Sequence, residues 1–290
     1  MLENKGNDTI RLIECPRDAM QGWPHFIPTE HKIEYLNALL QVGFDTIDFG
    51  SFVSPKAIPQ MADTKEVLKG IDMNHAKSKL LAIIANIRGA EEAVAYEQIS
   101  YLGFPFSISE TFQQRNTNST IEDSYKVVEQ IQSLCINNNK KLVVYLSMGF
   151  GNPYGDVFNE HILNEWAEKI YALGVEIISI ADTVGLATPD QVFHTTQSVI
   201  AQLPYATIGV HLHSSLDNLK PKLEAALKAG CKRFDSAMKG IGGCPMAGNT
   251  LVGNMDTEQM VAYLLEKGLP LQIDMLQLKQ CAAMAGRIFV

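Results

Sequence analysis

Residues 207–229 of this 290-residue chain read TIGVHLHSSLDNLKPKLEAALKA and contain one complete strand–helix unit. The segment begins with a short run rich in Ile, Val and Leu that lacks proline, which favours a β-strand. Leu216–Ala229 then shows apolar residues at helical spacing, and Gly230 follows where a helix should stop. A short apolar strand followed by an amphipathic helix is typical of a parallel sheet covered by helices. The fold therefore depends on how often this unit recurs.

Eight such units in about 270 residues predict an α/β fold, a (β/α)8 TIM barrel. The strands are expected at Ile10–Glu14, Thr46–Gly50, Leu80–Ala85, Phe104–Ser109, Leu142–Ser147, Ile177–Ala181, Thr207–His213 and Arg233–Ala237. Helices are expected from Thr29 onward and at Asp63–Lys69, Gly89–Ile99, Ser119–Asn137, Asn159–Leu173, Thr188–Gln202 and Leu216–Ala229, with a C-terminal closing helix in Leu271–Arg287.

The alternative to a barrel is a doubly wound open sheet. That fold favours a glycine-rich loop after the first strand, where it cradles a pyrophosphate. Here the first predicted strand is followed by Cys15-Pro16-Arg17-Asp18, which cannot form such a loop. No linker or low-complexity segment divides the chain, so we expect one catalytic domain over residues 1–290.

Composition and charge exclude several classes of protein. The formal net charge is −8 and no basic stripe is present, which argues against a nucleic-acid partner. No apolar run approaches the roughly 20 residues that span a bilayer, and the N-terminus has no secretory apolar segment, so no membrane association is expected. The five cysteines include no C-x-x-C pair, which favours a reduced, cytoplasmic protein.

Two histidines end the seventh predicted strand. Residues two apart in an extended segment face the same side, so His211 and His213 direct their imidazoles to one region. By itself such a pair is often a hydrogen-bonded feature of a core strand. In a TIM barrel, however, the carboxyl ends of strands one, seven and eight lie close together and carry the chemistry. Asp18 and Asn254 follow two of these strands, so the four side chains predict a site for one divalent ion such as Mg²⁺, Mn²⁺, Co²⁺ or Zn²⁺.

The other polar residues at strand ends allow two interpretations each. Asp18 could cap the helix after the first strand, and Arg17 could be a surface ion-pair partner. The position of Arg17 next to Asp18 instead favours a role as a fixed cation that stabilises a developing oxyanion. Asp48 could be a buried, hydrogen-bonded carboxylate. Cys244 follows the glycine-rich segment 240–243, which favours a mobile loop presenting a thiol over an inert cysteine.

Several segments together resemble one known family. They are Pro16-Arg17-Asp18, residues 51–56 (SFVSPK) with Pro59-Gln60-Met61, Asp182-Thr183-Val184-Gly185, His211-Leu212-His213, and residues 240–245 (GIGGCP) with Gly253-Asn254. In this order, and over nearly the whole chain, they resemble hydroxymethylglutaryl-CoA lyase. The Arg-Asp and His-x-His motifs mark a broader superfamily of barrel metallolyases that includes Claisen-type synthases and pyruvate-class aldolases. The SFVSPK and GGCP segments narrow the resemblance to the lyase.

The resemblance implies a metal-dependent retro-Claisen cleavage of hydroxymethylglutaryl-CoA to acetyl-CoA and acetoacetate. It implies an acyl-CoA substrate, a Mg²⁺ or Mn²⁺ cofactor and a homodimer. The implied metal ligands are Asp18, His211, His213 and Asn254. The implied catalytic residues are Arg17, which would stabilise the thioester enolate, Cys244, which would protonate it, and Asp48, at the position of a catalytic Glu. The implied supporting residues on the substrate side are Gln21, Asp182 and Ser51.

Some positions depart from the family pattern. Asp48 replaces Glu and is one methylene shorter, Cys15 stands where Gly is usual, and Ser214-Ser215 replace Asp-Thr. Lys239 adds a charge at the start of the glycine-rich loop. These changes leave the implied metal ligands intact and cluster at the substrate side. The alternatives are therefore a related lyase or aldolase acting on another hydroxyacyl-CoA or on a 4-hydroxy-2-oxo acid, and a barrel that binds metal or acyl-CoA without catalysis.

Overall fold

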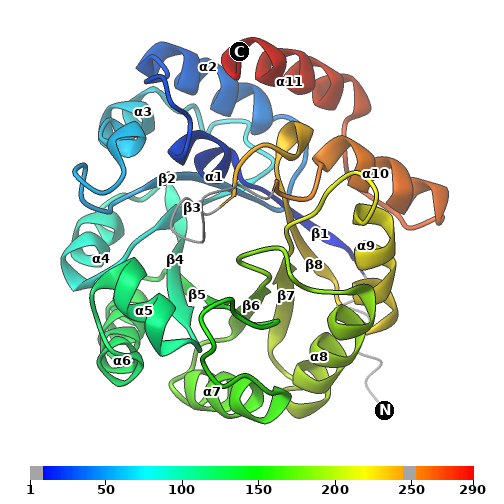
Figure 1. Ribbon diagram of the computed structural model, residues 1–290. Helices are drawn as coiled ribbons and strands as arrows, with labels where there is room; N and C mark the ends of the chain where they lie inside the picture. The colour runs from blue at the N-terminus through cyan, green and yellow to red at the C-terminus, as the bar shows by residue number, and fades with distance from the viewer. Residues whose placement is uncertain (1–8, 244–252) are drawn as a thin grey trace, which may run out of the picture.

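The computed structural model describes residues 9–243 and 253–290 and confirms the predicted TIM barrel. Eight parallel strands pair in sequence order, and the first also pairs with the last, so the sheet is closed (Figure 1). The strands are β1 (Arg11–Glu14), β2 (Thr46–Ser51), β3 (Lys79–Ile83), β4 (Ile99–Ser107), β5 (Lys141–Ser147), β6 (Ile177–Ala181), β7 (Thr207–His211) and β8 (Arg233–Ser236).

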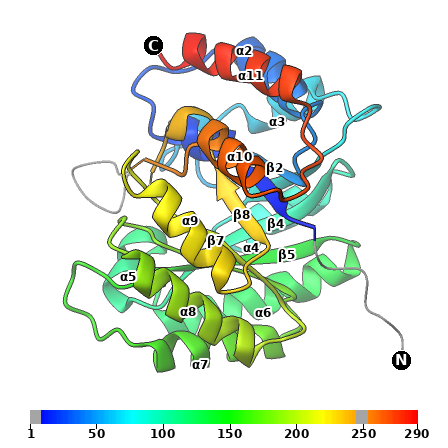
Figure 2. The same ribbon diagram turned by 90° about the vertical axis from the view of Figure 1, so that its right-hand side faces the viewer.

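Helices surround this barrel on the outside, and Figure 2 shows α8, α9 and α10 lying along the strands. The helices are α1 (Pro16–Gln21), α2 (Thr29–Leu39), α3 (Thr64–Gly70), α4 (Ile87–Val94), α5 (Glu110–Thr117), α6 (Ile121–Asn137), α7 (Glu160–Ala172), α8 (Pro189–Gln202), α9 (Leu219–Lys228), α10 (Thr257–Glu266) and α11 (Met275–Ile288). Among the described residues, no helix is both long and apolar enough to cross a bilayer.

The strands are continuous apolar runs because both of their faces are covered. Every residue of β2 and of β6 is buried. The outer faces of the strands pack against the helices in one large hydrophobic core, whereas Leu81, Val143 and Ile177 belong to a smaller apolar cluster. This second cluster also contains Tyr145, which lines the cavity described below.

Two local signals expected from the sequence, the glycine stop after α9 and the closing helix, are confirmed, and a helix cap is seen at the start of α8. Thr188 accepts a hydrogen bond from the Gln191 backbone and forms a capping box at the start of α8, with Pro189 in the first turn. Gly230 has a φ of 95° after α9, a left-handed conformation that favours glycine. The expected closing helix is α11, which packs beside α2 (Figure 1). The residue that caps α11, Asp274, also donates its backbone N–H to the carbonyl oxygen of Val42 over 2.8 Å, and Val42 lies just after α2.

The structure differs from the prediction in its fourth unit. β4 begins at Ile99, five residues before the predicted start at Phe104, and α4 ends at Val94 rather than Ile99. The added residues include Ser100 and Tyr101, which are half-buried and lack the apolar character of a fully buried strand. The short helix α5 and the longer α10 lie at segments for which no helix was predicted, and α1 lies where a helix after the first strand was one of two alternatives. Helices α1 and α5 directly follow the ends of β1 and β4, whereas α10 belongs to the outer ring of helices.

Closure of the barrel buries a carboxyl group at the end of β1. Glu14 accepts hydrogen bonds from the Met238 backbone N–H (2.8 Å) and the Thr257 hydroxyl (2.6 Å), and its side chain has no exposed area. Burial raises the pKa of Glu14 to about 8, although these two hydrogen bonds oppose the shift. The folded protein therefore holds a proton at Glu14 that the unfolded chain releases near pH 4.5.

We expect Glu14→Gln to flatten the pH dependence of stability. Because the folded pKa is raised, the contribution of Glu14 is fully present below pH 4.5 and is lost as pH rises through about 8. The slope is at most about 1.4 kcal/mol per pH unit in the free energy of unfolding. Chemical denaturation of the wild type and of Glu14→Gln at pH 6, 7 and 8 measures this slope. The control is Glu91→Gln, on the exposed face of α4. Parallel curves for wild type and Glu14→Gln would refute the burial effect.

Candidate metal centre and active site

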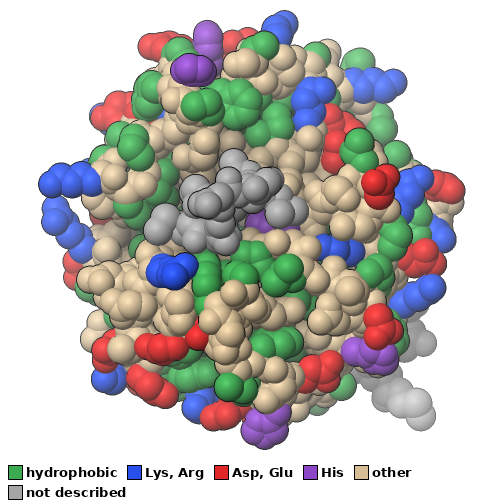
Figure 3. Space-filling view, viewed as in Figure 1, with side chains coloured by type: hydrophobic (Ala, Val, Ile, Leu, Met, Phe, Trp, Pro, Cys, Tyr) green, Lys and Arg blue, Asp and Glu red, His purple; other side chains and the backbone are tan. Residues whose placement is uncertain are grey.

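A cavity of about 220 Å³ opens at the carboxyl ends of the strands. Its polar side is lined by Arg17, Asp18, Gln21, Asp48, His211 and His213, and its apolar side includes Val53, Ile58, Ile83, Pro105 and Phe112. Figure 3 shows this end of the molecule, where the charged side chains of the described residues lie mostly around the periphery. The cavity lies where the strand-end rule placed the chemistry.

Three of the four predicted ligands converge at this cavity. One carboxylate oxygen of Asp18 and one ring nitrogen each of His211 and His213 lie within 4.8 Å of one another. Asp18 comes from the first turn of α1, just after β1, whereas His211 ends β7 and His213 lies two residues beyond. The fourth predicted ligand, Asn254, donates from Nδ2 to Asp18 Oδ2 over 2.7 Å. An isolated antiparallel bridge between His213 and Asn254 holds the two segments together.

The hydrogen bonds of the two imidazoles fix which nitrogen faces the cluster. The Nδ1 of His213 lies 3.1 Å from the Thr183 carbonyl oxygen, which can only accept, so this nitrogen carries the proton. The Nδ1 of His211 lies 3.2 Å from Asp235 Oδ2. A carboxylate or carbonyl behind a ligating imidazole is the usual support in metal sites. Nε2 of each ring is therefore left as the lone-pair donor.

Two buried lone pairs in this cluster have no hydrogen-bond partner among the described residues. They are Nε2 of His213 and Oδ1 of Asn254. A buried polar atom without a partner costs free energy unless a ligand satisfies it. The donor set of one carboxylate, two imidazoles and one amide oxygen suits a hard or borderline divalent ion with open positions. The residues present thus fit a metal ion.

The electrostatics of the cluster keep two of these ligands, Asp18 and His213, in their metal-binding forms, whereas the carboxylates of Asp235 and Asp18 outweigh burial and raise the pKa of His211. Burial works to raise the pKa of Asp18, but the Arg17 charge and the two histidines outweigh it and lower the pKa to about 2. Burial, with a smaller contribution from His211, lowers the pKa of His213 to about 4. At neutral pH, Asp18 is a carboxylate and His213 is a neutral imidazole. Metal ions bind these two forms.

Arg17 is held by acceptors on two sides. Its Nε donates to both oxygens of Asp48, at 3.2 and 3.0 Å, and Nη2 donates to Oδ2 as well. Its Nη1 donates to Asp18 Oδ1 over 3.1 Å and to Gln21 Oε1 over 2.9 Å. Burial raises the pKa of Asp48 to about 6, although the Arg17 charge opposes the shift. Arg17 is thus a fixed cation between the candidate metal ligands and a second carboxylate.

Two of the predicted supporting residues lie outside this cavity. Asp182 is buried and accepts from Lys222 Nζ at 2.8 Å and from the Ala187 N–H at 3.1 Å. Its chain neighbours Ala181 and Thr183 line the cavity instead. The hydroxyl of Ser51 accepts from the Val53 N–H at 3.1 Å, so it supports a cavity-lining residue rather than lining the cavity. Both residues therefore support the site indirectly.

Three buried charged residues near the site did not emerge from the sequence reasoning. Lys222 bonds Asp182 and the His213 carbonyl, and Asp235 and Arg233 form an ion pair behind His211. Signals for all three exist in the sequence. Lys222 interrupts the apolar face of its helix, and the other two occupy alternate positions of one short strand, so they face the same side.

The predicted thiol, Cys244, lies outside the described residues. Both described flanks of its loop reach Asp18. Gly243 donates its N–H to Asp18 Oδ2 over 3.3 Å, and Asn254 donates to the same oxygen. The four described cysteines, Cys15, Cys135, Cys231 and Cys281, are buried.

Comparisons with known proteins agree with this geometry. A family model described as HMGL-like matches residues 10–285. The cytoplasmic 3-hydroxy-3-methylglutaryl-CoA lyase of Rattus norvegicus is 33% identical over 269 residues, which cover 92% of this chain and 77% of that protein. The mitochondrial hydroxymethylglutaryl-CoA lyase of the same species is 33% identical over 263 residues, which cover 90% and 79%.

Solved structures give the same result. An HMG-CoA lyase from Acinetobacter baumannii, solved in complex with coenzyme A and 3-methylmalate, superposes with a TM-score of 0.90 at 32% identity. The superposition covers 97% of this chain and 92% of that one. The resemblance inferred from the sequence motifs is confirmed, and the chain belongs to the HMGL-like family.

Proposed function

We propose that this chain is a carbon–carbon lyase that cleaves 3-hydroxy-3-methylglutaryl-CoA to acetyl-CoA and acetoacetate, with Mg²⁺ or Mn²⁺ as cofactor. The observation that carries the proposal is the convergence of Asp18, His211 and His213 beside the Arg17 guanidinium in one cavity. The family and the activity named for the rat lyases support the same reaction.

The metal would be held by Asp18, His211, His213 and Asn254. A divalent ion there supplies Lewis-acid polarisation of the substrate's hydroxyl and carboxylate oxygens when it is bound. The protein contributes the orientation of the ligands. Thr183 fixes His213 through Nδ1, and the amide of Asn254 donates to Asp18 and to the Ile241 carbonyl, which leaves its Oδ1 for the ion.

The bond that breaks joins C2 and C3 of the acyl chain. When the C3 hydroxyl loses its proton, the C3 oxygen becomes the ketone of acetoacetate and the bonding pair passes to C2, forming the thioester enolate of acetyl-CoA. Asp48 lines the cavity and has a pKa of about 6, which suits the proposed role of accepting that proton. Arg17, already fixed by Asp48, stabilises the enolate oxygen without reorganising as charge develops.

A proton must then reach C2 to give the methyl group of acetyl-CoA. We assign this step to the thiol of Cys244, which would be regenerated by the proton that left the hydroxyl. The support for this assignment is that Gly243 and Asn254, the described residues near Cys244 in the sequence, both donate to Asp18 at the proposed metal centre.

The cavity volume bears on the substrate. A cavity of about 220 Å³ has room for an acyl group of this size. The acyl group would place its hydroxyl and carboxylate toward Asp18 and Arg17. The apolar lining of Val53, Ile58 and Phe112 would cover the remaining carbon atoms. The nucleotide would then extend out of the barrel mouth.

One assay tests the reaction. The protein is incubated with Mg²⁺ or Mn²⁺ and 3-hydroxy-3-methylglutaryl-CoA, and acetoacetate is measured against a sample treated with a chelator. We expect acetoacetate only in the metal-containing sample. Pyruvate released from 4-hydroxy-2-oxo acids, without acetoacetate, would assign the chain to an aldolase. Absence of both products in a protein that binds metal would favour a binding barrel.

Asn254→Ala tests the proposed ligand set. The change removes an amide oxygen ligand and the hydrogen bond that orients Asp18, so we expect Mn²⁺ affinity to fall by about 10- to 100-fold. Titration calorimetry measures this. The matched control is Asn164→Ala on α7, which also removes a buried Oδ1 that lacks a partner among the described residues but lies away from the cavity. Equal affinities in the two variants would contradict the assignment.

We further propose a homodimer in the cytoplasm. The matched lyases include a cytoplasmic and a mitochondrial protein at the same 33% identity, so their names do not choose the compartment. Light scattering tests the dimer, and fractionation of the source cells tests the location.

A further inference from the structure

An ion pair lies behind the metal-facing side of His211. Arg233 and Asp235 stand two residues apart in β8 and therefore face the same side of the strand. The two side chains are 4% and 0% exposed, and Arg233 Nη1 donates to Asp235 Oδ1 over 2.9 Å. The pair is close to the predicted metal site, yet no step of the proposed reaction uses it.

The fold makes room for Arg233. In the parallel pairing of β7 and β8, Arg233 stands opposite Gly209. A Cβ built at position 209 would lie 3.0–3.1 Å from three side-chain atoms of Arg233, which is tighter than ordinary packing. Glycine at this position lets the long side chain cross β7 without displacement. The arrangement therefore lets a long cationic side chain reach Asp235.

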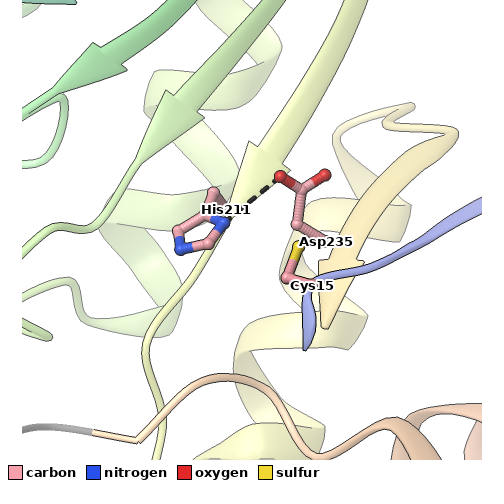
Figure 4. A group of neighbouring side chains, drawn as sticks. All are labelled: Cys15, His211 and Asp235. Carbon is pink, nitrogen blue, oxygen red and sulfur yellow. Dashed lines mark hydrogen bonds and ion pairs between the residues drawn. The ribbon is translucent and has the colours of Figure 1, made fainter. Parts of the chain in front are cut away.

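Asp235 connects the guanidinium to the imidazole. One of its oxygens accepts from Arg233, and the other lies 3.2 Å from Nδ1 of His211. Figure 4 shows this contact as a dashed line, with the second ring nitrogen of His211 directed away from Asp235. Cys15 lies beside the same carboxylate. Since Nδ1 is already bonded to Asp235, the group of Cys15, His211 and Asp235 does not offer an imidazole to a second ion.

We propose that Arg233 is a positioning residue for the metal centre, which fixes Asp235 so that His211 keeps its proton on Nδ1 and presents Nε2 to the ion. The guanidinium occupies Oδ1 and leaves Oδ2 in one orientation toward the ring. Without it, the buried carboxylate could rotate about its side-chain bonds, and His211 could turn or change tautomer. This inference rests on the proposed metal-dependent function, because it concerns one of the proposed ligands.

Metal affinity provides the first test. We expect Arg233→Met to weaken Mn²⁺ binding by about 10- to 100-fold, as is typical when a support behind a ligand is lost. Arg233→Lys keeps a cation within reach of Asp235 and should recover affinity to within a few fold of wild type. The control is Lys32→Met in α2, away from the site. This change also removes a buried cation from its carboxylate partner, which is Asp63. It should lower the melting temperature without changing Mn²⁺ affinity. A folded Arg233→Met protein with wild-type affinity overturns the proposal.

A spectroscopic test needs no substitution at Arg233. In metal-free protein labelled with ¹⁵N-histidine, long-range proton–nitrogen correlation spectra at pH 8.5 report the tautomer of each ring, and His211→Asn assigns the signal. We expect the His211 ring to be protonated on Nδ1 alone. A proton on Nε2 in the wild-type protein overturns the proposal even if Arg233→Met does not fold. Because neither test uses an acyl-CoA, a protein that binds Mn²⁺ but forms no acetoacetate would refute the proposed reaction and leave this inference standing.

Discussion

Arg17→Met is expected to lower the rate of acetoacetate formation by at least about 10²- to 10³-fold, the loss found when a preorganised oxyanion donor is removed. Mn²⁺ affinity should stay within a few fold of wild type. The reason is geometric. Arg17 contacts Asp18 through Oδ1 alone, whereas Asp18 Oδ2 is oriented independently by Asn254 and Gly243. Steady-state kinetics and calorimetric titration separate the two effects.

Two further variants separate the loss of the guanidinium from the loss of stability. Removing Arg17 leaves Asp48 buried and unpaired, which by itself destabilises a protein. The double variant Arg17→Met/Asp48→Asn removes that charge and should restore stability, so it controls for stability alone, because it also lacks the proposed proton acceptor. Arg17→Lys keeps the charge but loses the planar fork that bonds Asp48 and Asp18 at once, so it should also be slow. Full activity in any folded variant lacking the guanidinium would exclude Arg17 as the enolate stabiliser.

Lys222→Met is expected to lower the free energy of unfolding by about 3–5 kcal/mol, because it breaks a buried ion pair and leaves one charge uncompensated. Lys222 is 1% exposed and Asp182 is 2% exposed. The ammonium also donates to the His213 carbonyl over 2.7 Å, so it ties α9 to the ends of β6 and β7 at once. Denaturant titration measures the loss.

The double variant Lys222→Met/Asp182→Asn tests whether the charge imbalance causes that loss. Neutralising Asp182 removes the buried charge, while the amide oxygen can still accept from Ala187. We expect the double variant to be clearly more stable than Lys222→Met. Lys126→Met breaks an exposed pair with Asp123 in α6 and should leave the denaturation midpoint unchanged. A double variant no better than Lys222→Met would mean that Lys222 acts through packing and its hydrogen bond to the His213 carbonyl rather than by balancing the buried charge.

The fold was predictable because its strands are buried on both faces, and long apolar runs are easy to locate in a sequence. The fourth strand shows the limit. Ser100 and Tyr101, near its start, are only partly buried and follow a short helix closely, so their composition did not distinguish strand from helix. Burial therefore made the presence and order of the strands predictable. The start of β4 instead depends on its pairing with β3 and β5, which no local sequence pattern reveals.

The part of the site that depends only on the order of the strands in the barrel could be predicted from the sequence. The carboxyl ends of β1 and β7 adjoin those of β8 in a closed barrel, and this brought Asp18, His211 and His213 together as expected. Predicting the position of Asp182 required one further argument, from the alternation of side chains along the chain. Ala181 and Thr183 line the cavity, so the residue between them must face outward, where Lys222 meets it. The pairing of His211 with Asp235 depends on side-chain rotamers across two strands and could not be derived from sequence.

The buried carboxyl group of Glu14 imposes an order on how the protein is made. Its partners Met238 and Thr257 lie 224 and 243 residues later, and β1 gains its second neighbour only when β8 is present. A ribosome makes the amino-terminal units first, so most of the nascent chain exists before either partner does. Until then β1 is an open sheet edge, and pairing over such a separation forms slowly. The barrel therefore closes near the end of synthesis, and chains released early would expose that edge to chaperones and to one another.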